Sequence, residues 1–387
     1  MHKLLTLSRE FIRKADLLLL GLCLAASLFG IIIVASTTAY MGSTRFVLVQ
    51  TLAMIIGIGL YVIFSFIDID ILAERREILM IFNILFLSTL FIWGTDGGTG
   101  NRSWLAFSWL PFNIQPGEIC KISFIIVLAK TMSIYRNKVS SFRSVGQMVA
   151  ILGINVALIL AASSDAGVAL PYIIAFIFMA YVGGVNLGWF AAAGAGLAVA
   201  TPIIWTRFMQ DYQKNRILMI FDPTIDPQGA SVRWHTLNSL ASLQGGGMTG
   251  QGLFHGSRTQ TGGLLFAQHT DFVFSAIGEE LGMVGCLLVL LLLTAIVLRC
   301  IYVGVKSGSY MNRLICIGIA ATFMFQIIVN TGMCMGVFPV IGLTLPFISY
   351  GGSSLVTTFA AVGIVSGIRM RPAPDSSARY IRPAYTL

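Results

Sequence analysis

The chain has 387 residues, of which 56% are hydrophobic and only 11% are charged. Soluble domains carry about 25% charged residues, so the composition excludes the two or three soluble domains that the length alone would suggest. Most of the net charge of +9 comes from basic residues in loops that lie on one predicted side of a membrane. The positive charge therefore indicates how the chain is oriented in the membrane, and no nucleic-acid partner is expected.

Apolar runs of about 18 residues, the length needed to cross a bilayer, recur along the chain. They predict an all-α polytopic membrane protein, with residues 1–387 forming a single integral membrane domain. The first run is too long for a cleavable signal peptide and lacks a small-residue cleavage site. Ten spans are predicted, at residues 16–39, 46–67, 77–93, 118–133, 146–163, 166–183, 187–206, 272–303, 314–337 and 351–369.

Basic residues set the predicted orientation. Ten spans place both termini on one side, and that side holds 17 of the 25 Lys and Arg residues. Because Lys and Arg favour the cytoplasm, both termini are predicted to be cytoplasmic, with a short tail over residues 370–387. A large extracytoplasmic loop, residues 207–271, then lies between helices seven and eight. The outer loops hold most of the Gly, Pro, Asp and aromatic residues, so function is expected on the outer face.

The segment 101–121, NRSWLAFSWLPFNIQPGEICK, combines polar residues with a helix start. Pro116 suits the first position of a helix, and Glu118 suits its first turn, where a carboxylate is favoured. Glu118 can also pair with Lys121 three residues later, and a buried pair at membrane depth indicates a functional site. Arg102 lies where basic residues are scarce and is a candidate anion contact.

Two further outer segments leave alternatives open. Asp165, in SSDAGVALP, is either a turn residue or a functional residue whose small neighbours allow another backbone segment to approach closely. The 207–260 loop, with Arg216 among its mixed charges, is either solvated or binds an anionic ligand. Its stretch LQGGGMTGQGLFHG is not a P-loop, because no GK[ST] follows. The six cysteines and four histidines show no metal-ligand spacing and imply no disulfide framework.

The stretch HTDFVFSAIGEELG, residues 269–282, opens into a long apolar run. A helix from 271 to 303 would be about 48 Å long, so its first turns are expected to project beyond the hydrocarbon. Helical spacing would put five small or acidic residues on one face: Asp271, Ser275, Gly278, Glu279 and Gly282. That face either lines a cavity or reflects helix capping and solvation by Thr270 and Asp271.

The stretch LPFISYGGSSL, residues 345–355, interrupts the entry to the last span. Pro346 with Gly351 and Gly352 predicts an irregular segment. Such backbone is tolerated at membrane depth only where it lines a cavity or is covered by protein.

These segments, in this order, resemble the SEDS family (shape, elongation, division and sporulation), which includes proteins of the RodA and FtsW type. The resemblance covers about residues 16 to 368. The absence of a long N-terminal extension is compatible with the RodA type. The matching motifs are Arg102, Trp104, Gln115 to Glu118 and Lys121; Ser164 to Val168; Arg216, Asp222–Pro223, Gly246–Gly247, Gly250 and Gly252; His269 to Phe274 and Gly278 to Gly282; and Asn330, Gly336, Pro339, Gly342 and Pro346 to Ser354.

The resemblance implies a peptidoglycan glycosyltransferase of the bacterial plasma membrane. Such enzymes polymerise lipid II, a disaccharide-pentapeptide on undecaprenyl pyrophosphate, and work with a class B penicillin-binding protein. The family's essential aspartate falls on Asp271. The chain departs from the family pattern just before this residue, because Ala267–Gln268 stand where Pro-Glu or Pro-Asp is usual.

The implied reaction inverts an α-linked pyrophosphate to a β-1,4 bond, which requires a base beside the incoming hydroxyl. Asp271 is the expected base, or else the ligand of a divalent cation (Mg²⁺ or Mn²⁺) that acts on the hydroxyl. Arg102, Lys121 and Arg216 are the expected pyrophosphate contacts, with Glu118 holding Lys121. Further substrate contacts are expected from Asp165, His269 and Thr270, and structural or cavity roles from Glu279, Pro346, Ser349, Gly351 and Gly352.

Two other functions fit the same features. Polar residues in spans and broken helices also occur in transporters, so a lipid II flippase is one alternative. A non-catalytic scaffold for a penicillin-binding protein is the other. Neither requires a base at Asp271.

Overall fold

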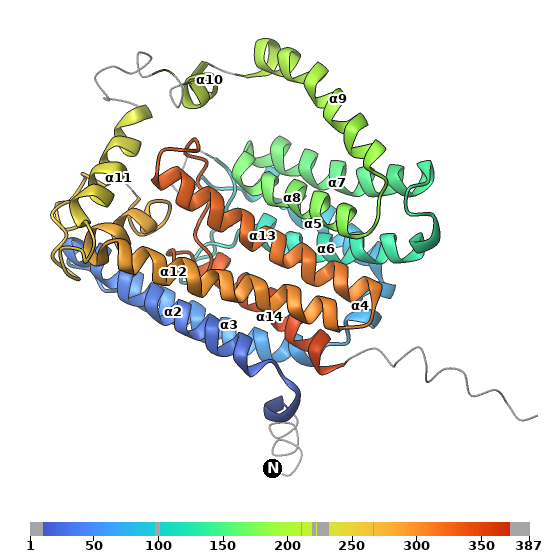
Figure 1. The fold of residues 1–387 in the computed structure, drawn as a ribbon, viewed down its shortest axis with the longest axis horizontal. Coiled ribbons are helices and arrows are strands. Elements are labelled where there is room, and N and C mark those ends of the chain that lie inside the picture. Colours follow the sequence, from blue (N-terminus) through green and yellow to red (C-terminus); the bar gives the residue numbers. More distant parts are fainter. Residues whose placement is uncertain are drawn as a thin grey trace, which may run out of the picture.

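The computed structural model describes residues 11–96, 101–209, 211–218, 222, 232–265 and 267–371. Most of these residues lie in ten long helices (Figure 1): α2 Leu17–Thr38, α3 Arg45–Phe66, α5 Arg76–Trp93, α6 Pro116–Ile134, α7 Phe142–Ser163, α8 Ala166–Val182, α9 Leu187–Ile203, α12 Val273–Lys306, α13 Tyr310–Cys334 and α14 Gly352–Met370. Shorter helical segments connect them: η1 Ala39–Met41, α4 Ile69–Glu74, η2 Arg136–Lys138, the π-helical turn η3 Ile204–Phe208, α10 Asp211–Leu218 and α11 Val232–Gly246.

Each predicted span coincides with one of the long helices, which confirms the all-α fold. The bounds differ by at most four residues, as at α7, which begins at Phe142 and not at 146. Within the described residues, eight helices are long and apolar enough to cross a membrane. Of the other two, α8 is apolar but has 17 residues, and α6 carries Glu118, Lys121 and Lys130. The count of ten spans therefore stays a prediction.

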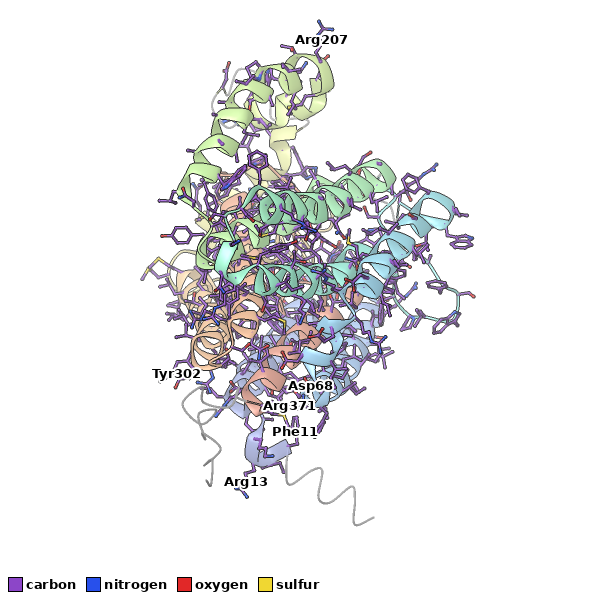
Figure 2. The ribbon with its side chains drawn as sticks, turned by 90° about the vertical axis from the view of Figure 1, so that its right-hand side faces the viewer. Phe11, Arg13, Asp68, Arg207, Tyr302 and Arg371 are labelled. Carbon is purple, nitrogen blue, oxygen red and sulfur yellow. The ribbon has the colours of Figure 1, made fainter. Side chains whose placement is uncertain are left out.

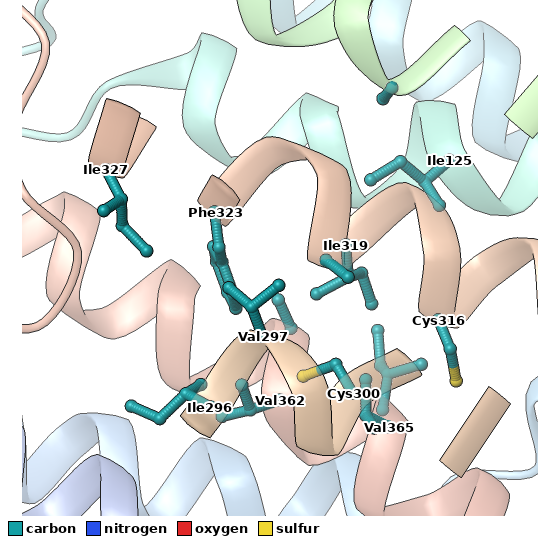
Figure 3. Packing of buried hydrophobic residues seen from close by; sticks show 14 of the residues in the cluster. Ile125, Ile296, Val297, Cys300, Cys316, Ile319, Phe323, Ile327, Val362 and Val365 are labelled. Atoms are coloured by element: carbon teal, nitrogen blue, oxygen red, sulfur yellow. The ribbon is translucent and has the colours of Figure 1, made fainter. Parts of the chain in front are cut away.

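Helices α13 and α14 form the centre of the bundle and are mostly buried, whereas the most apolar stretch of α9 has no buried residue. Figure 1 shows α9 leaning away from the other helices, and α11 beside the start of α12. Figure 3 shows the core where α12, α13 and α14 meet, with α6 behind. Side chains from these helices interdigitate there: Ile125, Ile296, Val297, Cys300, Cys316, Ile319, Phe323, Val362 and Val365.

Glycines allow α3 and α14 to pack closely. A Cβ on Gly57 would lie 2.7 Å from the Phe359 ring, and one on Gly363 would lie 2.8 Å from the Tyr61 backbone. Small residues of this kind permit close helix contact in a membrane, where apolar attraction between helices is weak.

A buried carboxylate ties four helices together at the opposite end from the start of α12. Asp16 is fully buried and accepts from Arg299 of α12, at 2.9 Å, and from Arg369 of α14, at 2.7 Å. It also caps α2 through the Leu19 N–H, and its carbonyl accepts from Tyr61 of α3. Removal of one partner would leave buried charge uncompensated, which is strongly destabilising.

Both ends of the described chain lie at one end of the molecule. Figure 2 shows Phe11 and Arg371 together, near Asp68, with Arg207 at the far end. A chain that crosses the membrane an even number of times, as the sequence predicts, would have both termini on the same side.

Candidate functional site

Four helices, α6, α8, α12 and α14, begin close together. The Gln115 N–H, just before α6, donates to Ser353 Oγ at the start of α14 (3.1 Å). In α8, a Cβ on Gly167 would lie 2.7 Å from the carbonyl oxygen of Ile341, in the segment that leads to α14. Helix starts expose free N–H groups and carry partial positive charge, so their convergence favours an anionic ligand.

Asp271 lies in a turn, residues 267–272, immediately before α12. Its carbonyl oxygen accepts from Asn330 Nδ2 of α13 at 2.9 Å, and the same Nδ2 donates to the Leu343 carbonyl at 2.7 Å. The thiol of Cys334 also donates to the Asp271 carbonyl, at 3.7 Å. Helix α13 therefore fixes the backbone that carries the Asp271 side chain.

The segment before α14 fixes the rest of the turn. Ser349 Oγ donates to the Thr270 carbonyl at 2.6 Å, and the Tyr350 N–H donates to the His269 carbonyl at 2.7 Å. The Ala267 carbonyl accepts from the N–H groups of Thr270 and Phe272. The turn is thus held by contacts from residues far away in the sequence.

The carboxylate of Asp271, in contrast, makes no hydrogen bond or ion pair within the part of the chain that the structure describes. It is half-buried, and its Oδ2 faces Gly342, where a Cβ would lie 3.8 Å away. Loss of water around it, followed by the negative charge of Asp165, raises the pKa of Asp271 to about 6. A fixed backbone with a free carboxylate of raised pKa is the arrangement that general-base catalysis requires.

Asp165 caps α8 and connects the neighbouring segments. Its carboxylate accepts from Ser103 Oγ at 2.8 Å and from the Val168 N–H at 3.3 Å. Burial, and to a smaller degree the charge of Glu118, raise the pKa of Asp165, although these hydrogen bonds oppose the rise. The charge of Asp165 thus acts on Asp271, and the charge of Glu118 acts on Asp165.

The predicted pair in the first turns of α6 is present. Lys121 Nζ lies 2.7 Å from Glu118 Oε2, and both side chains are more than nine-tenths buried. They line a small cavity between α6, α13 and α14, together with Thr322, Thr357 and Thr358. The buried charge pair therefore sits beside a small cavity whose remaining lining is mostly apolar, with Ile125, Ile319 and Phe323 among it.

The irregular segment before α14 is buried and tightly held. Pro346 is buried, and Phe347 after it adopts a left-handed backbone (φ 65°), which is rare for a bulky residue. Gln50 of α3 donates to the Ser349 carbonyl and accepts from the Gly351 N–H. At Gly352, a Cβ would lie 2.4 Å from the Phe112 ring. Protein covers this segment from several sides, as irregular backbone at membrane depth requires.

The predicted continuous helix from residue 271 is wrong. Helix α12 begins at Val273, and Gly282 interrupts it with non-helical dihedrals (φ 67°, ψ −165°). Asp271 therefore does not share a helical face with Ser275 and Glu279. The bonds that hold the 267–272 turn come from α13 and from the segment before α14, so helical periodicity alone could not reveal it.

The glycine-rich stretch completes the interrupted helix. The N–H groups of Gln251 and Gly252 donate to the carbonyls of Glu279 and Glu280, at 2.9 Å each. Across the break, the N–H groups of residues 283 and 284 donate to the carbonyls of residues 247 and 248. A Cβ on Gly246 would lie 1.8 Å from the Gly278 carbonyl oxygen, so glycine permits this close backbone pairing.

The carboxylates of Glu279 and Glu280 bind the loop of residues 257–261, which precedes them in the chain. Glu279 accepts from the N–H groups of Arg258 (2.6 Å) and Thr259 (3.2 Å). Glu280 accepts from Ser36 Oγ of α2 at 2.5 Å and from Thr259 Oγ1 at 3.0 Å. The two carboxylates thus hold the loop of residues 257–261 against α2 and α12.

The other predicted site residues have varied surroundings. The ring of His269 packs against Phe46 and Tyr350, with centroids 5.0 and 5.6 Å away, and burial lowers its pKa. The Thr270 hydroxyl donates to the Ala267 carbonyl at 3.2 Å. Arg102 is exposed, next to the Ser103 that binds Asp165. The side chain of Arg216 lies outside the described residues.

Several residues of the site had no role assigned from the sequence. Asn330, Ser103 and Gln50 each bind a residue distant in the chain. Asn330 belongs to a family motif, which is the signal that could have found it. Ser103 stands between Arg102 and Trp104 of another motif, and Gln50 is a polar residue within an otherwise apolar span.

Comparisons with known proteins agree with this fold. The family model described as cell cycle protein, of the FtsW, RodA and SpoVE type, matches residues 12–372. The chain is 32% identical to the peptidoglycan glycosyltransferase MrdB of Escherichia coli K12, over 70% of this chain and 71% of MrdB. It is 32% identical to a probable peptidoglycan glycosyltransferase FtsW of Geobacter sulfurreducens, over 96% of this chain and all of that protein.

Solved structures show the same fold. A chain of a peptidoglycan synthase complex that coordinates polymerisation and crosslinking superposes with a TM-score of 0.78 and 27% identity, over 93% of this chain and 99% of that one. A mutant of the rod shape determining protein RodA of Thermus thermophilus superposes with a TM-score of 0.67 and 25% identity, over 93% and 99%. The motifs, the fold and the family match together establish that this chain is a multi-pass membrane protein of the FtsW, RodA and SpoVE family.

Proposed function

We propose that this chain is a peptidoglycan glycosyltransferase that polymerises lipid II in the bacterial plasma membrane, with its active site on the outer face. The observation that carries this proposal is the free carboxylate of Asp271, on a turn whose backbone is bonded from two sides. It lies where α6, α8, α12 and α14 begin. A flippase or a scaffold would have no use for a base held in this way.

The reaction follows from these groups. Asp271 takes the proton from the incoming sugar hydroxyl, and the hydroxyl oxygen then forms a bond to the anomeric carbon of the donor sugar. The bond from that carbon to the pyrophosphate oxygen breaks, and undecaprenyl pyrophosphate leaves with its negative charge. Pyrophosphate needs no proton to leave, so one carboxylate and a source of positive charge are sufficient.

Positive charge for the pyrophosphate comes from Lys121, Arg102 and the helix starts. Lys121 lies beside a small cavity and is oriented by Glu118 (2.7 Å), whereas Arg102 is exposed and free to meet a ligand at the surface. Arg216 is proposed as a third contact. Asp165, His269 and Thr270 adjoin the same region and are proposed to shape the sugar sites.

A divalent cation is compatible with the site only if the substrate shares in binding it. Among the described residues, no group of three or more His, Cys, Asp or Glu side chains is placed to hold a metal ion. Mg²⁺ is commonly held by one or two carboxylates together with substrate phosphates. Asp271 would supply the protein ligand in that case, and the ion would neutralise charge on the pyrophosphate.

A partner is also proposed. The similar chain in the peptidoglycan synthase complex belongs to an assembly in which polymerisation and crosslinking are coordinated. We infer that this chain works with a class B penicillin-binding protein, whose transpeptidase activity would crosslink the new strand.

The test is polymerisation of purified lipid II by the wild-type chain and by Asp271→Ala, each with its penicillin-binding partner. The proposal expects glycan strands from the wild type and a loss of at least about a hundredfold in rate in the variant, the usual contribution of a general base. Polymer made by Asp271→Ala at the wild-type rate would refute the catalytic assignment.

A further inference from the structure

The residue three positions before Asp271 joins three separate parts of the structure. Gln268 is buried, and its amide Nε2 donates to the carbonyl of Thr37, in the last turn of α2, at 2.6 Å. The same Nε2 donates to the Thr259 carbonyl at 2.9 Å. Thr259 belongs to the loop held by Glu279 and Glu280, so Gln268 links the Asp271 turn to α2 and to this loop.

The backbone next to Gln268 is also constrained. Ala267 has a left-handed conformation, with φ at 47°, which residues other than glycine rarely adopt. Its carbonyl oxygen accepts from the N–H groups of Thr270 and Phe272, at 3.0 and 3.2 Å, and from Thr270 Oγ1. Rare backbone conformations persist where the surroundings enforce them, often at functional sites.

These contacts complete the support of Asp271. Asn330 and Ser349 hold the turn from α13 and from the segment before α14. Gln268 holds it from the opposite side, through α2 and the 257–261 loop. The backbone that carries the Asp271 carboxylate is thereby held between two groups of elements that meet at the site.

We infer that Ala267 and Gln268 position the Asp271 carboxylate, and that the neutral amide of Gln268 is essential to this role. The inference rests on the proposed function, because it takes Asp271 to be the base. Gln268 itself lies away from the reacting atoms and acts through the turn.

Physical chemistry limits which residues could replace this pair. A carboxylate at position 268 has no N–H to donate and would face two carbonyl oxygens, on a loop already bound by Glu279 and Glu280. A proline at position 267 has φ fixed near −65° and could not adopt the observed turn. Neither a carboxylate at position 268 nor a proline at position 267 could therefore hold the turn in this way.

The experiment measures kcat and KM for lipid II, with the partner present, in Gln268→Met, Gln268→Glu and Ala267→Pro. Since misplacement of a catalytic group by about 1 Å can cost up to about a hundredfold, we expect kcat to fall by about tenfold or more, with KM changed by less than about twofold. Ala267→Gly, which accepts φ 47° without strain, should keep the wild-type kcat. The ratio of kcat between Ala267→Pro and Ala267→Gly separates the effect of backbone geometry at this position from that of side-chain chemistry.

Gln260→Met is the matched control. Gln260 also donates from the 257–261 loop to α2, at the Ser36 carbonyl (2.9 Å), but it is not part of the Asp271 turn. We expect it to keep the wild-type kcat even if it lowers thermal stability. All rates are taken on monodisperse protein, so that loss of folded material is not counted as loss of kcat.

Wild-type kcat in Gln268→Met and Ala267→Pro would overturn the inference. A loss of kcat in Gln260→Met equal to that in Gln268→Met would also overturn it. Neither result would affect the proposed function, which fails separately if Asp271→Ala polymerises lipid II at the wild-type rate.

Discussion

At the scale of single residues, Asp271 combines a backbone that is bonded on both sides with a carboxylate that has no bonded partner among the described residues. Asn330 and Ser349 provide the backbone contacts, at 2.9 and 2.6 Å. A backbone fixed in this way presents the side chain at one place, and such preorganisation is how catalytic sites gain rate. The same partial burial that restricts the side chain also raises its pKa.

The first prediction concerns pH. Because the pKa of Asp271 is raised to about 6, the base is ionised above that pH, and polymerisation should fall as the pH drops through about 6. Asp165→Asn removes the negative charge that contributes to this rise while keeping an oxygen to cap α8. The acid limb of the pH–rate profile should therefore move to lower pH in this variant.

A profile of kcat against pH for the two proteins checks this. Asp165→Asn with an unchanged acid limb would show that Asp165 does not act on the base. If the acid limb moves to higher pH in Asp165→Asn, the charge of Asp165 lowers the pKa of Asp271 and does not raise it.

The second prediction concerns the buried pair. Lys121→Met leaves Glu118 buried without its cation, which should cost about 3–5 kcal/mol of stability. Glu118→Gln together with Lys121→Met removes both charges and should recover most of this stability, but not the affinity for lipid II. Thermal unfolding in detergent and binding of lipid II to the two variants separate the two effects. Wild-type affinity in the double variant would remove Lys121 from the pyrophosphate site.

At the scale of elements, the interrupted helix α12 depends on the glycine-rich loop. The backbone of residues 247–252 occupies the gap that the left-handed Gly282 opens. A Cβ at Gly282 would lie 2.4 Å from the Gly250 nitrogen. The loop and the first turns of α12 thus form one unit behind the Asp271 turn.

Gly282→Ala tests this unit against Gly184→Ala. Both glycines have positive φ, at 67° and 84°, but a Cβ on Gly184 would meet nothing within 4 Å. Both variants should lose about 1–2 kcal/mol to backbone strain, and Gly282→Ala should lose about 1–3 kcal/mol more to overpacking. Equal shifts of the unfolding temperature would mean that the loop does not pack against the break.

The sequence predicted the helices and the Glu118–Lys121 pair because both depend on local spacing. The start of α6 at Pro116 was also predicted, since it depends on residues of the same segment. The break at Gly282 and the turn at Asp271 were not predicted, because their hydrogen bonds come from Met248, Gln251, Asn330 and Ser349. The motif that contains Gly282 has the composition of an ordinary helix start.

At the scale of the whole molecule, two ends with different chemistry are held apart by an apolar bundle. One end has the converging helix starts and the Asp271 turn. The other has the buried Asp16, bound by Arg299 and Arg369, and both ends of the described chain. The proposed base at one end and the basic residues at the other are consistent with the proposed active site on the outer face of the membrane.

The predicted orientation can be tested by labelling. All six cysteines are buried, so single cysteines can be introduced at exposed positions. Trp109→Cys, where the tryptophan is 76% exposed, should react with an impermeant maleimide in intact cells. Lys306→Cys, at the end of α12, should react only after the cells are opened. The reverse pattern would contradict the assignment of the site to the outer face.

The most direct measurement is the single-turnover rate of Asp271→Asn with purified lipid II and the penicillin-binding partner, alongside lipid II binding. Asparagine keeps the size of the side chain and leaves the backbone contacts of Asn330 and Ser349 in place, but it cannot accept the proton. If Asp271 is the base, Asp271→Asn should bind lipid II as the wild type does but react at a rate lower by about a hundredfold or more. Bond formation at the wild-type rate by Asp271→Asn would contradict this assignment.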